Sequence, residues 1–299
     1  MFQYRAAFLA GLSAFSCLPG HAADIAVKAP RIVYPAPAVD GFNTKIDAFG
    51  GTLTNESLYG AKGSFSLPLG HSYGLQIDGA VGSFDSEVFA AGQAHLFWRD
   101  PSRALFGVYA SHTFWDKFSG LNATQLGAEG YLYNGPWSLG GTAGAEFGNA
   151  TSGVVGGLVE SYDVQTRFFD KIDLSYYLND NFRVSVGHRY TGGRHAAAAG
   201  LEFGVATGGG TMVALFGEGR LGEDDYRGIW GGLRLYWGQK DKSLIRRHRQ
   251  DDPPGFEPDN LATMKNGMTT KPVPDKSAPA GCPPEAPYMT SSGCSPMPP

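Results

Sequence analysis

The residues best suited to do chemistry in this chain are charged side chains that recur at every second position of apolar segments. Fifteen of them share this pattern, eight basic and seven acidic, so their charges nearly cancel. Such a set could line a narrow aqueous path with weak ion selectivity, or it could fill an interior with salt bridges and conduct little. The pattern is equally compatible with both. The set is Lys45, Asp47, Lys62, Asp78, Arg99, Glu129, Glu146, Lys171, Asp173, Arg183, Arg189, Glu202, Glu218, Arg220 and Arg234.

No arrangement typical of an enzyme accompanies these charges. Residues 217–222 spell the G-x-G-x-x-G fingerprint of dinucleotide-binding sites, but that fingerprint works only between a strand and a helix, and another alternating segment follows it here. His71 and His95 have no nucleophile and orienting carboxylate at a recognisable spacing. We therefore expect no catalytic residue, no metal site and no cofactor.

The N-terminus has the pattern of a secretory signal peptide. Arg5 precedes an apolar stretch at residues 6–15, and the small residues Gly20 and Ala22 stand at positions −3 and −1 of a cleavage site. Residues 1–22 are therefore expected to be removed on export.

Proline and glycine divide the remaining chain into three parts. Residues 23–40 are proline-rich and free of glycine, which suits an extended linker. Residues 41–237 hold 36 of the 43 glycines but only three prolines, and we expect these prolines in turns because proline is expelled from strand interiors. Residues 238–299 hold 12 of the 19 prolines, which predicts a disordered tail.

Two cysteines, Cys282 and Cys294, lie within the last 18 residues of the chain. In an exported protein, two thiols twelve residues apart most simply form one disulfide. The bridge would close a small local loop without organising the rest of the tail.

Composition excludes several classes of protein. Charged residues make up only 17% of the chain, whereas soluble domains carry about a quarter. No apolar run of 18 residues occurs beyond the extreme N-terminus, which argues against a multi-helix membrane protein. The net charge of −4 offers no basic face for nucleic acid.

Polar and apolar residues alternate at period two along the middle region, in segments of about ten residues, the length that a tilted strand needs to cross a bilayer. Alternate connections between these segments are tight turn sequences, and the others include longer loops, an asymmetry typical of outer-membrane barrels. We predict twelve strands at 42–52, 57–67, 73–83, 88–99, 103–112, 122–133, 137–147, 168–178, 182–190, 197–206, 211–221 and 227–237.

The predicted fold is therefore an all-β, transmembrane, antiparallel up-and-down barrel at residues 41–237. An even strand number places both termini on the periplasmic side. Aromatic residues cluster at the predicted strand ends, where they could form two girdles at the lipid headgroups. The competing fold is a secreted β-sandwich, which also alternates. The girdle at the end with longer loops would include Phe49, Tyr59, Phe84, Phe89, Phe114, Trp115, Phe147, Tyr190 and Tyr226.

Three segments carry a resemblance to known proteins. Residues 23–30 resemble the leader of Gram-negative outer-membrane barrels of the opacity-porin type, and residues 95–102 and 238–253 resemble segments of uncharacterised exported barrel-like proteins. The resemblance implies no catalytic residues. Such barrels usually end on the aromatic of their last strand, whereas 62 residues follow Trp237 here.

The sequence thus predicts an outer-membrane barrel that acts as a passive narrow pore or as a structural envelope protein. Its expected partners are outer-membrane lipid, lipopolysaccharide and the barrel-assembly machinery, with peptidoglycan as a further partner of a periplasmic tail. The alternatives are a barrel hydrolase acting on envelope lipid and a secreted β-sandwich adhesin.

Overall fold

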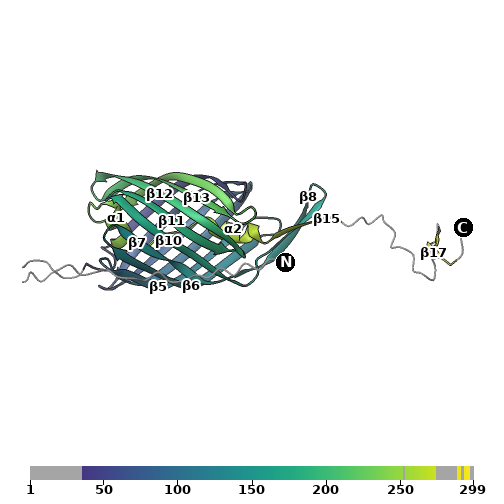
Figure 1. Cartoon of the computed structure of the whole chain (residues 1–299), viewed down its shortest axis with the longest axis horizontal. Coiled ribbons are helices and arrows are strands. Elements are labelled where there is room, and N and C mark those ends of the chain that lie inside the picture. The colour runs from purple at the N-terminus through teal and green to yellow at the C-terminus, as the bar shows by residue number, and fades with distance from the viewer. Residues whose placement is uncertain (1–35, 252, 274–287, 291–292, 297–299) are drawn as a thin grey trace, which may run out of the picture. The chain divides into compact units, whose positions relative to one another are not determined.

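The strands predicted from the alternation form a closed barrel. The computed structural model describes residues 36–251, 253–273, 288–290 and 293–296. Twelve antiparallel strands pair in chain order, and β1 pairs with β14 to close the barrel (Figure 1), which confirms the predicted fold. The barrel strands are β1 (Asn43–Leu53), β2 (Glu56–Leu69), β3 (Tyr73–Phe84), β4 (Glu87–Asp100), β5 (Ala104–Trp115), β6 (Leu121–Asn134), β7 (Trp137–Gly148), β10 (Arg167–Asn179), β11 (Phe182–Thr191), β12 (Arg194–Gly208), β13 (Thr211–Gly222) and β14 (Arg227–Trp237).

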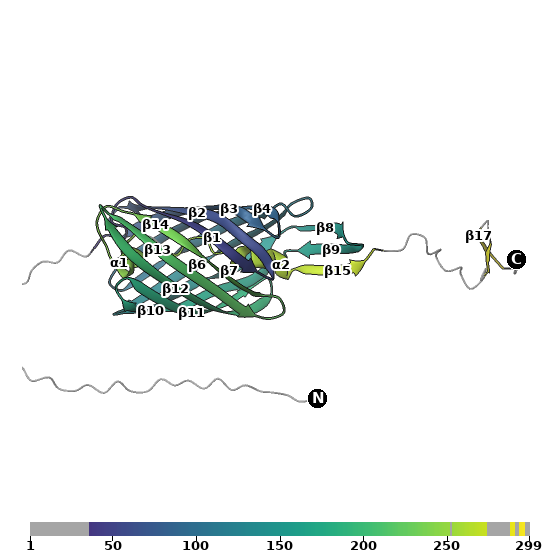
Figure 2. The ribbon, with the colours of Figure 1, turned by 90° about the horizontal axis from the view of Figure 1, so that it is seen from above.

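The two ends of the barrel differ in their connections. At the end where β1 begins and β14 finishes, here called the terminal end, all connections are turns of two or three residues. At the opposite end, the loop end, β7 and β10 are joined by a hairpin of β8 (Ala150–Val155) and β9 (Leu158–Asp163), which projects beyond the barrel (Figure 2). Some loop-end turns are also tight. Thr54 and Asn55 have φ of 50° and 65°, as type I′ turns require.

The outer wall of the barrel is apolar and its inner wall is polar. Leu139, Leu201 and Leu233 point outward and are 47%, 48% and 56% exposed, whereas Glu129 and Glu146 point inward and are buried. Successive side chains of a strand lie on opposite faces, so one face of each strand can meet lipid while the other meets the interior. The single closed sheet excludes the β-sandwich fold that the sequence left open.

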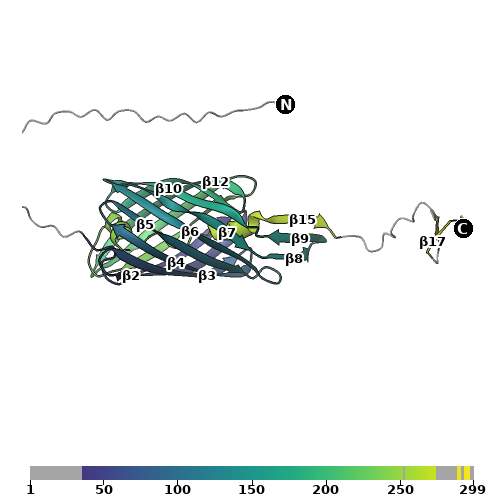
Figure 3. The same cartoon turned by 90° about the horizontal axis from the view of Figure 1, so that it is seen from below.

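The segment after β14 is folded at residues 238–251 and 253–273, so the prediction of a disordered tail at residues 238–299 is wrong for this part of it. We call residues 238–273 the tail. It forms α1 (Leu244–Gln250) at the terminal end and α2 (Asp259–Asn266) near the loop end (Figure 2). Its last element, β15 (Met268–Pro272), pairs with β9 beyond the barrel (Figure 3). Neither helix of the described residues is long and apolar enough to span a membrane.

Several predicted features fall on residues that the structure does not describe. The signal peptide at residues 1–22 lies outside the described residues, as do most of the linker at residues 23–40 and Cys282. Cys294 lies in β17 (Gly293–Ser295), which pairs with β16 (Tyr288–Thr290), and it is disulfide-bonded.

Candidate functional site

The fifteen charged residues singled out from the sequence all lie on the inner wall of the barrel. Seven of them line a cavity of about 90 Å³ that lies between the two tail helices: Lys45, Lys62, Asp173, Arg183, Arg189, Glu218 and Arg234. The other eight are buried against the wall or the tail: Asp47, Asp78, Arg99, Glu129, Glu146, Lys171, Glu202 and Arg220. The parity of the strands thus brings the whole set into one lumen.

Opposite charges on this wall pair across strands. Asp47 of β1 accepts two hydrogen bonds from Arg234 of β14, at 2.8 and 2.7 Å, and lies 3.3 Å from the Lys62 ammonium. Glu202 of β12 accepts a third hydrogen bond from Arg234, at 2.9 Å, and lies 3.4 Å from Arg183. These five groups form one network, as expected for a salt-bridged interior.

The helix α1 covers the terminal mouth of the lumen. The His248 ring lies between two hydroxyl groups, with its Nδ1 2.8 Å from that of Tyr177 and its Nε2 2.9 Å from that of Tyr236. The backbone N–H of Leu244 donates to the side chain of Asn181, in the turn between β10 and β11, at 3.0 Å. These contacts fix α1 to strands on different sides of the mouth.

The first described residues of the chain enter the same mouth. Ala38 and Val39 are buried, and the Ala38 carbonyl accepts a hydrogen bond from Arg99 at 3.0 Å. Val39 packs against Phe97 and Leu105 of the inner wall. Both ends of the barrel sequence therefore help to narrow this opening.

Between the helices the tail crosses the lumen without regular secondary structure. Lys62 of β2 donates a hydrogen bond to the Phe256 carbonyl at 2.7 Å, so the wall holds the backbone of the tail directly. Gly255 passes so close to the wall that a Cβ atom there would lie 2.7 Å from the Asp78 carboxylate. A larger residue at this position would push the tail or Asp78 away.

The first turn of α2 carries a charged anchor. Asp259 accepts hydrogen bonds from Arg220 at 2.9 and 2.7 Å and from the Tyr226 hydroxyl at 2.6 Å, and Arg189 lies 3.7 Å away. The guanidinium groups of Arg220 and Arg189 thus keep the Asp259 carboxylate ionised. A two-bond pairing of this kind also fixes the direction of α2.

Polar residues further along α2 contact other strands. The Lys171 ammonium of β10 donates to the Asn260 side-chain oxygen at 2.6 Å, and the Asn260 amide donates to Ser111 of β5 at 3.1 Å. The Thr263 hydroxyl donates to the Glu146 carboxylate of β7 at 3.3 Å. Side chains of three separate strands therefore form hydrogen bonds with the polar residues of this short helix.

The C-terminal turn of α2 is tied to two loop-end turns. Lys265 lies 2.8 Å from the carboxylate of Glu56 and 3.4 Å from that of Asp85. Burial raises the pKa of Asp85, but Lys117 and Lys265 lower it by more, so this group is also ionised at neutral pH. These bridges hold α2 at the loop end.

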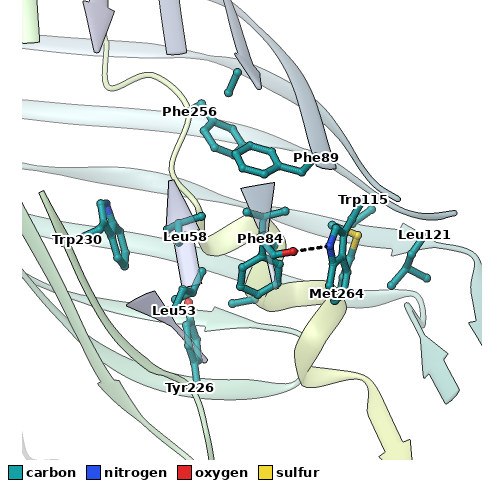
Figure 4. Packing of buried hydrophobic residues seen from close by; sticks show 14 of the residues in the cluster. Leu53, Leu58, Phe84, Phe89, Trp115, Leu121, Tyr226, Trp230, Phe256 and Met264 are labelled. Carbon is teal, nitrogen blue, oxygen red and sulfur yellow. Dashed lines mark hydrogen bonds between the residues drawn. The ribbon is translucent and has the colours of Figure 1, made fainter. Parts of the chain in front are cut away.

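An apolar core fills the lumen around α2 (Figure 4). Phe84, Phe89 and Trp115 of the wall are fully buried together with Phe256 and Met264 of the tail. The Trp115 indole N–H donates to the Phe84 carbonyl at 3.0 Å, and the rings of Phe89 and Phe256 stack with centroids 6.1 Å apart. This half of the barrel thus has the interior of a globular protein.

The core corrects the prediction of an aromatic girdle near the loop end. Phe49, Phe84, Phe89, Trp115 and Tyr226 are buried inside the protein and do not face lipid. The alternation along β5 could have predicted the inward direction of Trp115, because successive side chains of a strand lie on opposite faces. Trp115 is an even number of positions from the polar, inward-facing residues of β5.

A second interior group that sequence reasoning missed surrounds His95. Its ring nitrogens lie 2.8 Å from the Glu129 carboxylate and 3.1 Å from the Asp78 carboxylate. The two acids come from β6 and β3, and the latter pairs directly with the strand of His95. Hairpin register could have indicated the first contact, because it places Asp78 opposite Gln93, two residues from His95. Glu129 lies two strands from His95, so its contact depends on how far the side chains reach across β5.

A histidine pair on the outer wall near the loop end bears on the hydrolase alternative. Nδ1 of His188 lies 2.7 Å from the Asp170 carboxylate, as in acid–base pairs of hydrolases, and its Nε2 lies 3.0 Å from Nδ1 of His195. Both ring nitrogens of His188 are therefore occupied, so it is not arranged to activate a hydroxyl nucleophile.

Comparison with solved structures returns membrane barrels at low sequence identity. An outer membrane channel from Pseudomonas putida F1 is 12% identical, with 70% of this chain and 99% of that chain covered and a TM-score of 0.47. The KdgM porin is 10% identical, covering 65% and 98% with a TM-score of 0.42. An outer membrane phospholipase from Salmonella typhi is 12% identical, covering 71% and 95% with a TM-score of 0.40.

No family model matches the chain, and no curated protein matches it in sequence. The fold is given by the strand pairing itself, which closes without an edge, and by the apolar outer wall. The chain has the fold of outer-membrane β-barrel proteins, with twelve antiparallel strands around a lumen that its own tail occupies.

Proposed function

We propose that this protein is a structural barrel of the Gram-negative outer membrane, closed by its own tail. The apolar outer wall supports a place among lipid and lipopolysaccharide, and an inserted barrel of this kind implies the barrel-assembly machinery as a partner. The short turns support a terminal end that faces the periplasm, since periplasmic turns of such barrels are short and their outer loops longer.

The observation that carries closure is that three cations of the wall form hydrogen bonds with the tail. Lys62 is bonded to the Phe256 carbonyl, Lys171 to Asn260, and Arg220 to Asp259. A passing ion would have to displace these partners. The cavity of about 90 Å³ between the tail helices has room for a few water molecules. Of the two functions expected from the sequence, the structural one is therefore favoured over the open pore.

Conductance of the full-length protein in planar bilayers tests this function. We expect insertion without steady current, because the tail blocks the lumen. A full-length variant that combines Glu257→Gln with Asp259→Asn removes two carboxylates of the tail and should show openings, which would prove that the inserted barrel can be detected. Steady ohmic current from the unaltered protein, equal to that of the variant, would refute closure and support the passive pore.

A further inference from the structure

The two ends of the tail lie at opposite ends of the barrel. At its start, the backbone N–H of Gly238 donates to the Gly210 carbonyl, in the terminal-end turn between β12 and β13, at 2.9 Å. At its other end, the N–H of Val273 donates to the Gly157 carbonyl, in the turn of the β8–β9 hairpin, at 3.3 Å. The described tail therefore passes once along the whole lumen.

The exit of the tail is built as a strand pairing outside the barrel. The five residues of β15 pair with β9 from Met268 opposite Tyr162 to Pro272 opposite Leu158. Together with β8 they form a three-stranded sheet beyond the loop end (Figure 3). Because each pairing adds backbone hydrogen bonds, this sheet fixes the emerged chain on the loop side.

The membrane sides follow from this path. The inference rests on the proposed function, in which the terminal end faces the periplasm. A chain that enters the lumen at that end and pairs with a loop-end hairpin has crossed the membrane. We infer that this barrel carries its own C-terminal segment through the outer membrane and presents it at the cell surface, from β15 onward.

One further observation fits this direction. The contacts of α1, α2 and β15 succeed one another in chain order from the terminal mouth to the hairpin, so the tail need not double back. A C-terminal segment at the cell surface would meet partners outside the cell, and contact with peptidoglycan would be lost.

Cysteine labelling of the full chain in intact cells tests the crossing. The probe is a maleimide that cannot pass the outer membrane. The test variant is Lys271→Cys, in β15, and the periplasmic control is Lys240→Cys, whose parent side chain is 67% exposed at the start of the tail. Val155→Cys, in the hairpin, reports the side of the loop end independently of the tail. The unaltered protein measures labelling of its native cysteines.

We expect Lys271→Cys and Val155→Cys to be labelled equally in intact cells, and Lys240→Cys only after the membrane is permeabilised. Labelling of Val155→Cys in intact cells, with Lys271→Cys reached only after permeabilisation, would overturn the crossing and leave the proposed barrel intact. The reverse pattern, with Lys240→Cys labelled in intact cells, or a protein recovered without membrane, would instead overturn the proposed function and its orientation.

A second measurement covers the case in which β15 shields a cysteine at Lys271 from the probe. An epitope tag placed after Pro299 should be removed by protease added to intact cells, while the barrel keeps its heat-dependent mobility on gels. A tag that survives until the cells are permeabilised would contradict surface presentation.

Discussion

Replacing Asp259 with asparagine should loosen the tail within the barrel. The variant keeps the size of the side chain but loses the charge that accepts two hydrogen bonds from Arg220 and one from Tyr226. Removing one partner of a buried ion pair costs about 3–5 kcal/mol. We expect the lower value, about 3 kcal/mol, because Glu218 and Glu257 still lie 3.2 and 3.8 Å from Arg220 and offset part of its charge.

This loss changes the ratio of docked to undocked tail about 100-fold, since each 1.4 kcal/mol is about a factor of ten. The assay is the fraction of time that single barrels conduct in planar bilayers. The matched control is Asp225→Asn in the loop-end connection between β13 and β14, where the side chain is 71% exposed and the substitution should leave the tail docked. An Asp259→Asn barrel that is folded, by its heat-dependent mobility, and as silent as the control would refute our reading of Asp259 as an anchor.

Two other outcomes follow from the two walls of the barrel. Trp115→Ala should lower the free energy of unfolding by about 3–5 kcal/mol, seen as a lower temperature of heat-dependent unfolding. Trp137 lies on the outer wall and is 45% exposed, so Trp137→Ala should lower this free energy clearly less. Leu126→Arg places a charge toward lipid near the middle of β6 and should cost about 2–4 kcal/mol in refolding titrations.

The barrel could be predicted from the sequence because its two walls face different environments. In β7, Leu139 faces lipid and Glu146 faces the lumen. In the paired strands β11 and β12, Arg183 faces the lumen and Leu201 faces lipid. Polar and apolar residues therefore alternate along the strands. The predicted strands therefore agree with the observed ones to within a few residues at most ends. Local turn chemistry added the positions of the connections.

The tail could not be predicted in the same way, because its partners are distant in the chain. Prolines are dense across residues 238–299, yet the stretch that forms α2 has none. Its polar residues Asp259 and Asn260 are stable when buried only because Arg220 and Lys171 meet them in the lumen. The composition of the segment indicates how it would behave alone in water. It contains no information on the partners that the inner wall of the barrel supplies.

The contacts of α2 also bear on the order of folding. Its polar residues Asp259 and Asn260 use β13, β10 and β5, and β14 continues directly into the tail. Because β5 and β13 lie on opposite sides of the barrel, α2 gains these anchors only when the sheet has curled almost to closure. Closure of the seam and docking of the tail are therefore coupled steps with large sequence separation, a slow and cooperative kind of folding. Refolding kinetics followed at the seam and at α2 should share one rate-limiting phase.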